Sequence, residues 1–181
     1  MTSIPGGNPH FLLDPLNGAA VAETIAEHFC ALDVGRCGEY RDRAAAFRRT
    51  IGEALERWTT RLAPYRGAKL VTYHDSWMYF TERFGLEIVG FVESRPGVPP
   101  ASSHVATLSD LIRREGVKVI VMEPYFSRSI PDLIARQTGA QVLVLAPSVG
   151  ALPATDDYVS MCDVNVGRLA EALSIGEKNR P

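Results

Sequence analysis

The chain has 181 residues, of which 46% are hydrophobic and 22% are charged. This is the composition of an ordinary folded domain, and it excludes a disordered chain, a collagen-like repeat and a coiled-coil rod. Nineteen Lys and Arg against 21 Asp and Glu give a formal charge of -2. With no long basic block, no nucleic-acid partner is expected. No apolar run reaches the roughly 18 residues of a membrane span, so no direct membrane insertion is expected.

The chain opens with MTSIPGGNP, which contains neither a basic nor an apolar stretch. No secretory signal peptide is predicted, and taken alone this favours a cytoplasmic chain. The three cysteines, Cys30, Cys37 and Cys162, lack CxxC spacing. They are interpreted as thiols without redox or metal function. A bridge between Cys30 and Cys37 would require an oxidising compartment.

The first third of the chain predicts a loop followed by two helices. Residues 1–17 are rich in Pro, Gly, Asn and Asp around the apolar run Phe11–Leu13, which predicts a loop carrying one short strand. Asn17 is expected to cap a helix over 18–32. Apolar residues then recur every three or four positions over 38–63. This predicts a helix of about 25 residues, roughly 37 Å long, which can connect two lobes.

From residue 69 onward, short runs rich in Val, Ile and Leu alternate with helical patterns. This order predicts an α/β fold with a four-stranded parallel sheet, flanked by helices and joined by right-handed crossovers. The predicted strands are 70–73, 86–92, 117–122 and 141–145, and the predicted helices are 76–84, 102–115, 128–138 and a last one through Tyr158 and Leu173.

Side chains that can bind a metal or move a proton follow three of the four predicted strands. His74 and Asp75 follow the first, Glu93 the second and Glu123 the third. Ligands of a parallel sheet bind at these carboxyl ends, although such residues also cap helices or form ion pairs. Asp75 is interpreted as a helix cap or as a partner that orients His74. His10 is a further candidate because its loop is bracketed by prolines.

Several chemical signatures are missing from the sequence. Neither G-x-G-x-x-G nor G-x-x-x-x-G-K-[ST] follows a predicted strand. The G-x-S-x-G motif of serine hydrolases is also absent. Nucleotide cofactors and serine hydrolase chemistry are therefore not expected.

Short motifs are distributed along the whole chain. They are NPHFLLDP at 8–15, VTYHDSWMYF at 71–80, RFGL at 83–86, Glu93 with PG at 96–97 and PP at 99–100, EP at 123–124, TGA at 138–140, and Tyr158 with Met161 and Asn165. Together, and with two helices between the first and second motifs, they resemble the zinc and manganese substrate-binding proteins of bacterial ABC importers.

The resemblance implies two α/β lobes joined by one long helix, with a metal ion held between the lobes. Residues 1–37 would be a remnant of the N-terminal lobe, 38–66 the interlobe helix and 67–181 the C-terminal α/β lobe. The opening part of the family's N-terminal lobe, with its first metal-binding histidine, has no counterpart, so an N-terminally truncated member is expected. In such a chain the helix over 18–32 would lack its packing partner. A periplasmic or cell-surface location is also implied.

The resemblance further implies that His10 and His74 bind the metal. Where the family often has an aspartate, in the loop after the last strand, this chain has Ala146. Glu123 is the preferred replacement, with 156–157 as alternatives. Zinc is favoured because the implied ligands include imidazoles, and manganese is the alternative. The implied function is a solute receptor of an ABC-type metal importer, with the membrane permease as its partner.

Two other functions stay open. In the first, a metal-dependent hydrolase, the two histidines and Glu123 hold zinc with an open position for water. The second is a truncated product that binds nothing tightly. If a shared zinc site exists, His10 and His74 must lie within about 8 Å of each other, because zinc–nitrogen bonds are about 2 Å long.

Overall fold

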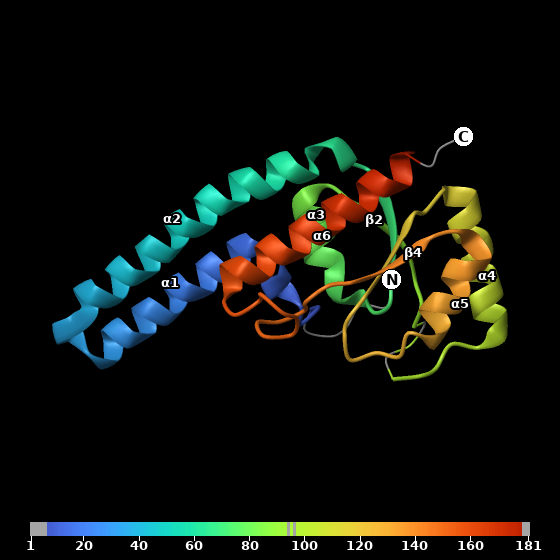
Figure 1. Cartoon of the computed structure of the whole chain (residues 1–181). Coiled ribbons are helices and arrows are strands. Elements are labelled where there is room, and N and C mark those ends of the chain that lie inside the picture. The colour runs from blue at the N-terminus through green and yellow to red at the C-terminus, as the bar shows by residue number, and fades with distance from the viewer. Residues whose placement is uncertain (1–6, 94, 96, 179–181) are drawn as a thin grey trace.

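The computed structural model describes residues 7–93, 95 and 97–178, and its helices and strands follow one another along the chain as Figure 1 shows. The helices are α1 (Pro15–Leu32), α2 (Cys37–Leu62), α3 (Met78–Phe84), α4 (Ser102–Glu115), α5 (Ser129–Thr138) and α6 (Tyr158–Lys178), and the strands are β1 (Lys69–Thr72), β2 (Glu87–Phe91), β3 (Val119–Met122) and β4 (Gln141–Val144). Single 3-10 turns cover Phe11–Leu13, Val34–Arg36, Ala63–Tyr65 and Asp75–Trp77. Among the described residues, no helix has the length and apolar character needed to cross a membrane.

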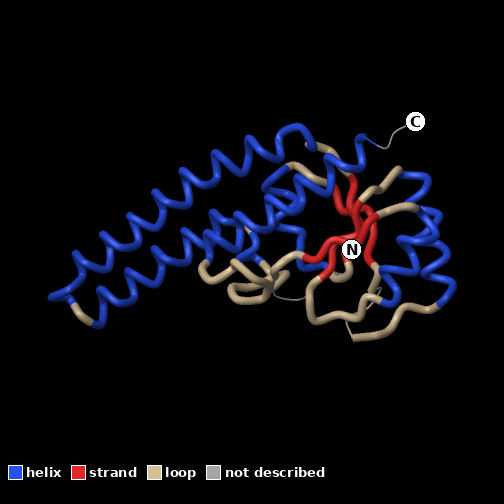
Figure 2. The backbone as a smooth tube through the Cα atoms, in the orientation of Figure 1, coloured by secondary structure: helices blue, strands red, loops and turns tan. Residues whose placement is uncertain are grey.

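The four strands form one parallel sheet in the order β2-β1-β3-β4. The predicted α/β fold with its four-stranded parallel sheet is therefore confirmed. Figure 2 shows the strands between α3 and α6 on one side and α4 and α5 on the other. Side chains alternate between these two layers, because successive residues of a strand point to opposite faces. On β3, for example, Val119 and Val121 join the core beside α6, whereas Ile120 joins the core beside α4 and α5.

The helices α1 and α2 form a long antiparallel hairpin that projects from the sheet (Figure 1). The helix predicted over 38–63 is confirmed, since α2 covers Cys37–Leu62. The tip of the hairpin is closed by a disulfide between Cys30 and Cys37. The interpretation of these two cysteines as free thiols is therefore wrong: the turn between the helices brings their Cα atoms to 4.4 Å. Cys162 is a buried free thiol.

The helix α1 has a packing partner within this chain, so the expectation that it lacks one is wrong. Ala19 and Ala26 are buried in the hairpin, where their small side chains allow α2 to approach closely. The same helix nevertheless leaves part of its apolar face in water, with Ile25 48%, Phe29 49% and Leu32 83% exposed.

The entry into α1 differs from the prediction in two ways. Phe11–Leu13 forms a 3-10 turn and not a strand. Asp14, not Asn17, caps α1: its Oδ1 accepts the Leu16 N–H at 3.0 Å, and Pro15 begins the helix. Proline is favoured at that position because it lacks the N–H that would otherwise be unpaired. Asn17 instead donates its side-chain N–H to the carbonyl of Phe11 at 2.9 Å.

Three contacts fix the segment that carries His10 against the rest of the molecule. The carboxylate of Asp14 accepts two hydrogen bonds from the guanidinium of Arg83, at 2.8 and 2.6 Å. The side-chain amide of Asn8 donates to the carbonyl of Asp75 at 2.9 Å. The hydroxyl of Tyr158 donates to the carbonyl of residue 12 at 2.6 Å. The segment is therefore held by α3, by the loop after β1 and by α6.

Candidate metal site

The residues singled out from the sequence lie at the carboxyl edge of the sheet. His74 and Asp75 follow β1, Glu93 follows β2 and Glu123 follows β3. The strands stay paired up to this edge, because the Glu93 N–H donates to the carbonyl of Tyr73 at 2.9 Å. The sheet itself therefore determines how close these side chains come to one another.

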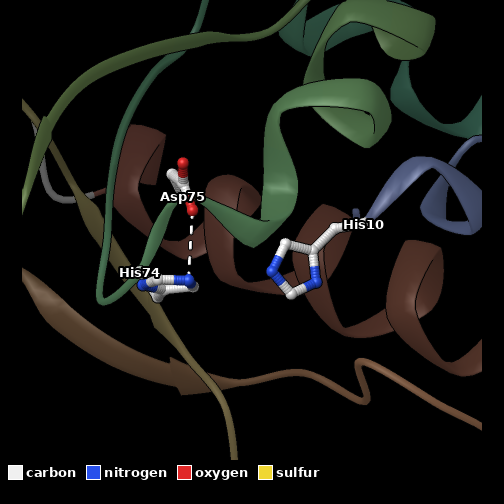
Figure 3. Close-up of side chains that lie close together, drawn as sticks. All are labelled: His10, His74 and Asp75. Atoms are coloured by element: carbon white, nitrogen blue, oxygen red, sulfur yellow. Dashed lines mark ion pairs between the residues drawn. The ribbon is translucent and has the colours of Figure 1, made fainter. Parts of the chain in front are cut away.

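Three side chains that could hold a metal ion converge at this edge: His10, His74 and Asp75 (Figure 3). One ligand atom from each lies within 4.8 Å of the others. The two imidazole rings have centroids 5.5 Å apart and planes at 84°. The prediction that His10 and His74 lie close together is thereby confirmed. All three side chains are only partly exposed, so an ion at this point would remain reachable from solvent.

Both ring nitrogens of His74 face a carboxylate. Nδ1 lies 2.8 Å from Oε2 of Glu93, and Nε2 lies 3.1 Å from Oδ1 of Asp75. Glu93 is in turn held by the Gly97 N–H, which donates to its Oε1 at 2.7 Å. The sequence favours Asp75 as the orienting partner of His74, but Asp75 contacts Nε2, the nitrogen on the side of the cluster. Glu93 contacts the other nitrogen, Nδ1, and so can orient the ring. The sequence signal for this contact is that Glu93 follows β2, the strand paired with the one that precedes His74.

Glu123 is not a member of this three-residue group. Its side chain is completely buried, and its Oε1 accepts the indole N–H of Trp77 at 3.2 Å. Its Oε2 has no hydrogen-bond partner among the described residues. Burial raises the pKa of Glu123, whereas the nearby Ser76 hydroxyl and the charge of His74 act in the opposite direction. Its role as a metal ligand stays a prediction.

The loop after β4 is held in place by hydrogen bonds from α6. Ala146 is fully buried, and the side chain of Asn165 on α6 bonds both to its N–H and to its carbonyl, each at 2.8 Å. Asp157 accepts the Ser160 N–H at 2.9 Å, which places it at the start of α6. Neither Asp156 nor Asp157 joins the three-residue group.

His10 has a pKa below its ordinary value of 6.5. The largest cause is burial, which disfavours the charged form, followed by repulsion from the positive charge of His74. The carboxylate of Asp75 acts in the opposite direction. The folded chain therefore holds this proton less tightly than the unfolded chain. Stability from this group is complete above pH 6.5 and is lost as the pH falls through the folded-state pKa.

In the metal-free protein, His74→Ala should raise the pKa of His10, because it removes the repelling charge. Asp75→Asn should lower that pKa further, because it removes the stabilising carboxylate. The ring proton of His10, followed by NMR between about pH 4 and 8, measures both shifts. Shifts in the reverse directions, or none in either variant, would show that these groups do not interact. Any affinity of this cluster for zinc should decrease as the pH drops through the same range, because only a neutral imidazole can bind an ion.

The chain is therefore an α/β protein in which two imidazoles and a carboxylate, at the carboxyl edge of a parallel sheet, have the chemistry to hold a metal ion. The chain belongs to the family described as ZnuA, the periplasmic component A of the zinc-uptake complex, whose model it matches over residues 3–172. The resemblance drawn from the sequence motifs is thereby confirmed at the level of the family.

Among curated proteins, the chain is 27% identical over 138 residues to the high-affinity zinc uptake system protein ZnuA of Brucella abortus, covering 76% of this chain and 41% of that protein. It is 23% identical over 175 residues to the zinc-binding protein AdcA of Streptococcus pyogenes, covering 94% of this chain and 34% of that protein. The chain thus spans well under half the length of these relatives.

Solved structures show the same fold. The laminin-binding adhesin Lmb from Streptococcus agalactiae, in a mutant form, superposes with a TM-score of 0.81 at 27% identity, covering 94% of this chain and 66% of that chain. A crystal structure of ZnuA gives a TM-score of 0.80 at 26% identity, covering 92% of this chain and 60% of that chain. Both neighbours are longer than the chain.

Proposed function

We propose that this chain binds zinc as part of a solute receptor that supplies an ABC-type metal importer. The observation that carries the proposal is the convergence of His10, His74 and Asp75 at the carboxyl edge of the sheet. Two imidazoles and a carboxylate suit zinc, and manganese is the alternative because it favours oxygen ligands. The ion is the cargo: the site holds and releases it, and no reaction is proposed.

The proposed ligands are His10, His74 and one carboxylate. Asp75 is the first choice because its oxygen already lies within the cluster. Its Oδ1 and Nε2 of His74 lie 3.1 Å apart, and both can share one cation. Glu123, proposed from the sequence, is the second choice. It would have to turn its unpartnered Oε2 toward the ion.

The division into three parts belongs to the same proposal. Residues 1–37 are proposed as part of an N-terminal lobe, 38–66 as the interlobe helix and 67–181 as the C-terminal lobe. A periplasmic or cell-surface location is supported by the family description and by the Cys30–Cys37 disulfide, which is stable in oxidising compartments. The partner on the membrane is proposed to be the importer's permease.

Competition with a chromogenic zinc chelator tests the proposal. The chain should bind one zinc ion, more weakly than a site with four protein ligands would. Asp75→Asn should weaken binding by at least about tenfold, whereas Glu123→Gln should change it by less than about threefold. A chain that takes no zinc from the chelator contradicts the function. The reverse order of the two variants would make Glu123 the third ligand.

A further inference from the structure

We propose that Glu93 is a positioning residue: it keeps the proton of neutral His74 on Nδ1, so that the lone pair on Nε2 is presented to the metal ion. The inference rests on the proposed function, because it concerns how His74 meets the ion. Glu93 is not one of the proposed ligands. Its role would be to orient a ligand from the loop that follows β2.

The carboxylate of Glu93 is fixed at both of its oxygens. Oε2 lies 2.8 Å from Nδ1 of His74, and Oε1 accepts the Gly97 N–H at 2.7 Å. The Glu93 side chain is only 7% exposed and that of His74 20%. Water therefore competes little for this hydrogen bond. The backbone bond between residue 93 and Tyr73 ties the two loops together, so the pair is held by the sheet and not by flexible side chains.

A neutral imidazole carries one ring proton, and an ionised carboxylate can only accept it. Both ring nitrogens of His74 face a carboxylate, but the contact with Glu93 is shorter, at 2.8 Å against 3.1 Å for Asp75, and Glu93 is the less exposed of the two, 7% against 29%. With Glu93 in place, the proton of a neutral His74 lies on Nδ1. Nε2 then has a lone pair and faces the Asp75 oxygen at 3.1 Å. Two electron-pair donors at this distance suit a shared cation.

Without Glu93, Asp75 is the remaining carboxylate partner of His74 among the described residues. The ring proton would then move to Nε2, where Asp75 accepts it. The nitrogen that should bind the ion would be blocked by its own proton, and the ring would have to rotate or exchange tautomers first. Outer partners of metal-binding histidines are typically worth about 10–100-fold in metal affinity.

The tautomer of His74 can be read directly from long-range nitrogen–proton NMR spectra of the full metal-free chain at about pH 8, above the usual histidine range. The wild-type chain should show the proton on Nδ1. In Glu93→Ala it should lie on Nε2, and zinc affinity should fall by about 10–100-fold. Glu93→Gln keeps an accepting oxygen and should retain both the Nδ1 proton and most of the affinity. Glu87→Ala, on the exposed start of β2, is the matched control and should change neither reading.

A wild-type spectrum with the proton on Nε2 overturns the proposal by itself, even if a variant does not fold. So does a folded Glu93→Ala variant that keeps the Nδ1 proton. Zinc affinity that does not depend on His74 at all contradicts the proposed function instead, and leaves the tautomer result intact. The two ideas can therefore fail separately.

Discussion

Replacing His74 by alanine should lower the zinc affinity of this chain by at least about 100-fold, more than the loss of any group that only supports a ligand. The ring of His74 lies 5.5 Å from that of His10, centroid to centroid, and shares the cluster with Asp75. Removing it leaves one imidazole and one carboxylate, which is too few ligands for a tetrahedral zinc site. His10→Ala should cause a loss of similar size, because it removes the other imidazole.

Chelator competition measures these losses, and far-UV circular dichroism confirms that the variants remain folded. His28→Ala is the matched control, because His28 is an exposed histidine on α1 and lies outside the cluster. The double variant His10→Ala/His74→Ala should bind no better than either single one, because each loss alone already breaks the site. Unchanged affinity in both single variants would mean that zinc binds elsewhere on the chain.

The sheet could be predicted from the sequence because its signals are local. Runs such as Val119–Met122 are apolar, rich in β-branched residues and bounded by glycine and polar residues. The ends of each observed strand lie within two residues of the predicted ends. The parallel arrangement followed from the helical patterns between them. That arrangement also explains why His74, Glu93 and Glu123 were rightly placed at one edge.

The ligand geometry could not be predicted, because it depends on side-chain directions and on burial. Glu123 ends a strand just as Glu93 does, yet its carboxylate lies fully buried against Trp77. Position along a strand does not distinguish a residue at the surface of the edge from one beneath it. Asp75 lies in the cluster although the sequence indicates only a cap or an orienting partner. It begins a 3-10 turn, in which its side chain reaches the ring of His74, its neighbour in sequence.

The sequence leaves the disulfide only as an alternative and favours the wrong cap for α1, and the two have different reasons. Cys30 and Cys37 lie in two separate helices, and only the tight turn between these helices makes the pair adjacent. Asn17 and Asp14 are both good capping residues, so residue type alone does not distinguish them. Pro15 does, since proline favours the first helical position.

Asp14 contributes both to the stability of this fold and to the position of a residue in the proposed metal site. Asp14→Ala removes the cap of α1, which typically costs about 0.5–2 kcal/mol. It also leaves the guanidinium of Arg83, whose side chain is 34% exposed, without the carboxylate that accepts two of its hydrogen bonds. Breaking a fully buried pair costs about 3–5 kcal/mol, and the partial exposure of Arg83 reduces that figure. We therefore expect a total loss of about 2–4 kcal/mol, or a Tm lower by roughly 4–16 °C.

Two variants separate the contributions of Asp14. Asp14→Asn keeps a good capping side chain but loses the charge, so it should cost less than alanine. Arg83→Met removes the ion pair from the other side and leaves the cap. The double variant Asp14→Asn/Arg83→Met should then cost less than the sum of its parts, because both changes break the same contact. Asp42→Ala, exposed on α2, is the control and should stay within about 0.5 kcal/mol of the wild type.

The substitution Asp14→Ala should also weaken zinc binding, because Asp14 anchors the segment that carries His10. Zinc binds the folded chain and so raises its Tm by an amount that grows with affinity. In Asp14→Ala this zinc-induced rise should be smaller than in the wild type, beyond the loss of Tm in the metal-free protein. Thermal unfolding with and without zinc measures both effects in one experiment. If Asp14→Ala lost stability but kept the full zinc-induced rise, His10 would be held by Asn8 and Tyr158 alone, and the ion pair would serve only the fold.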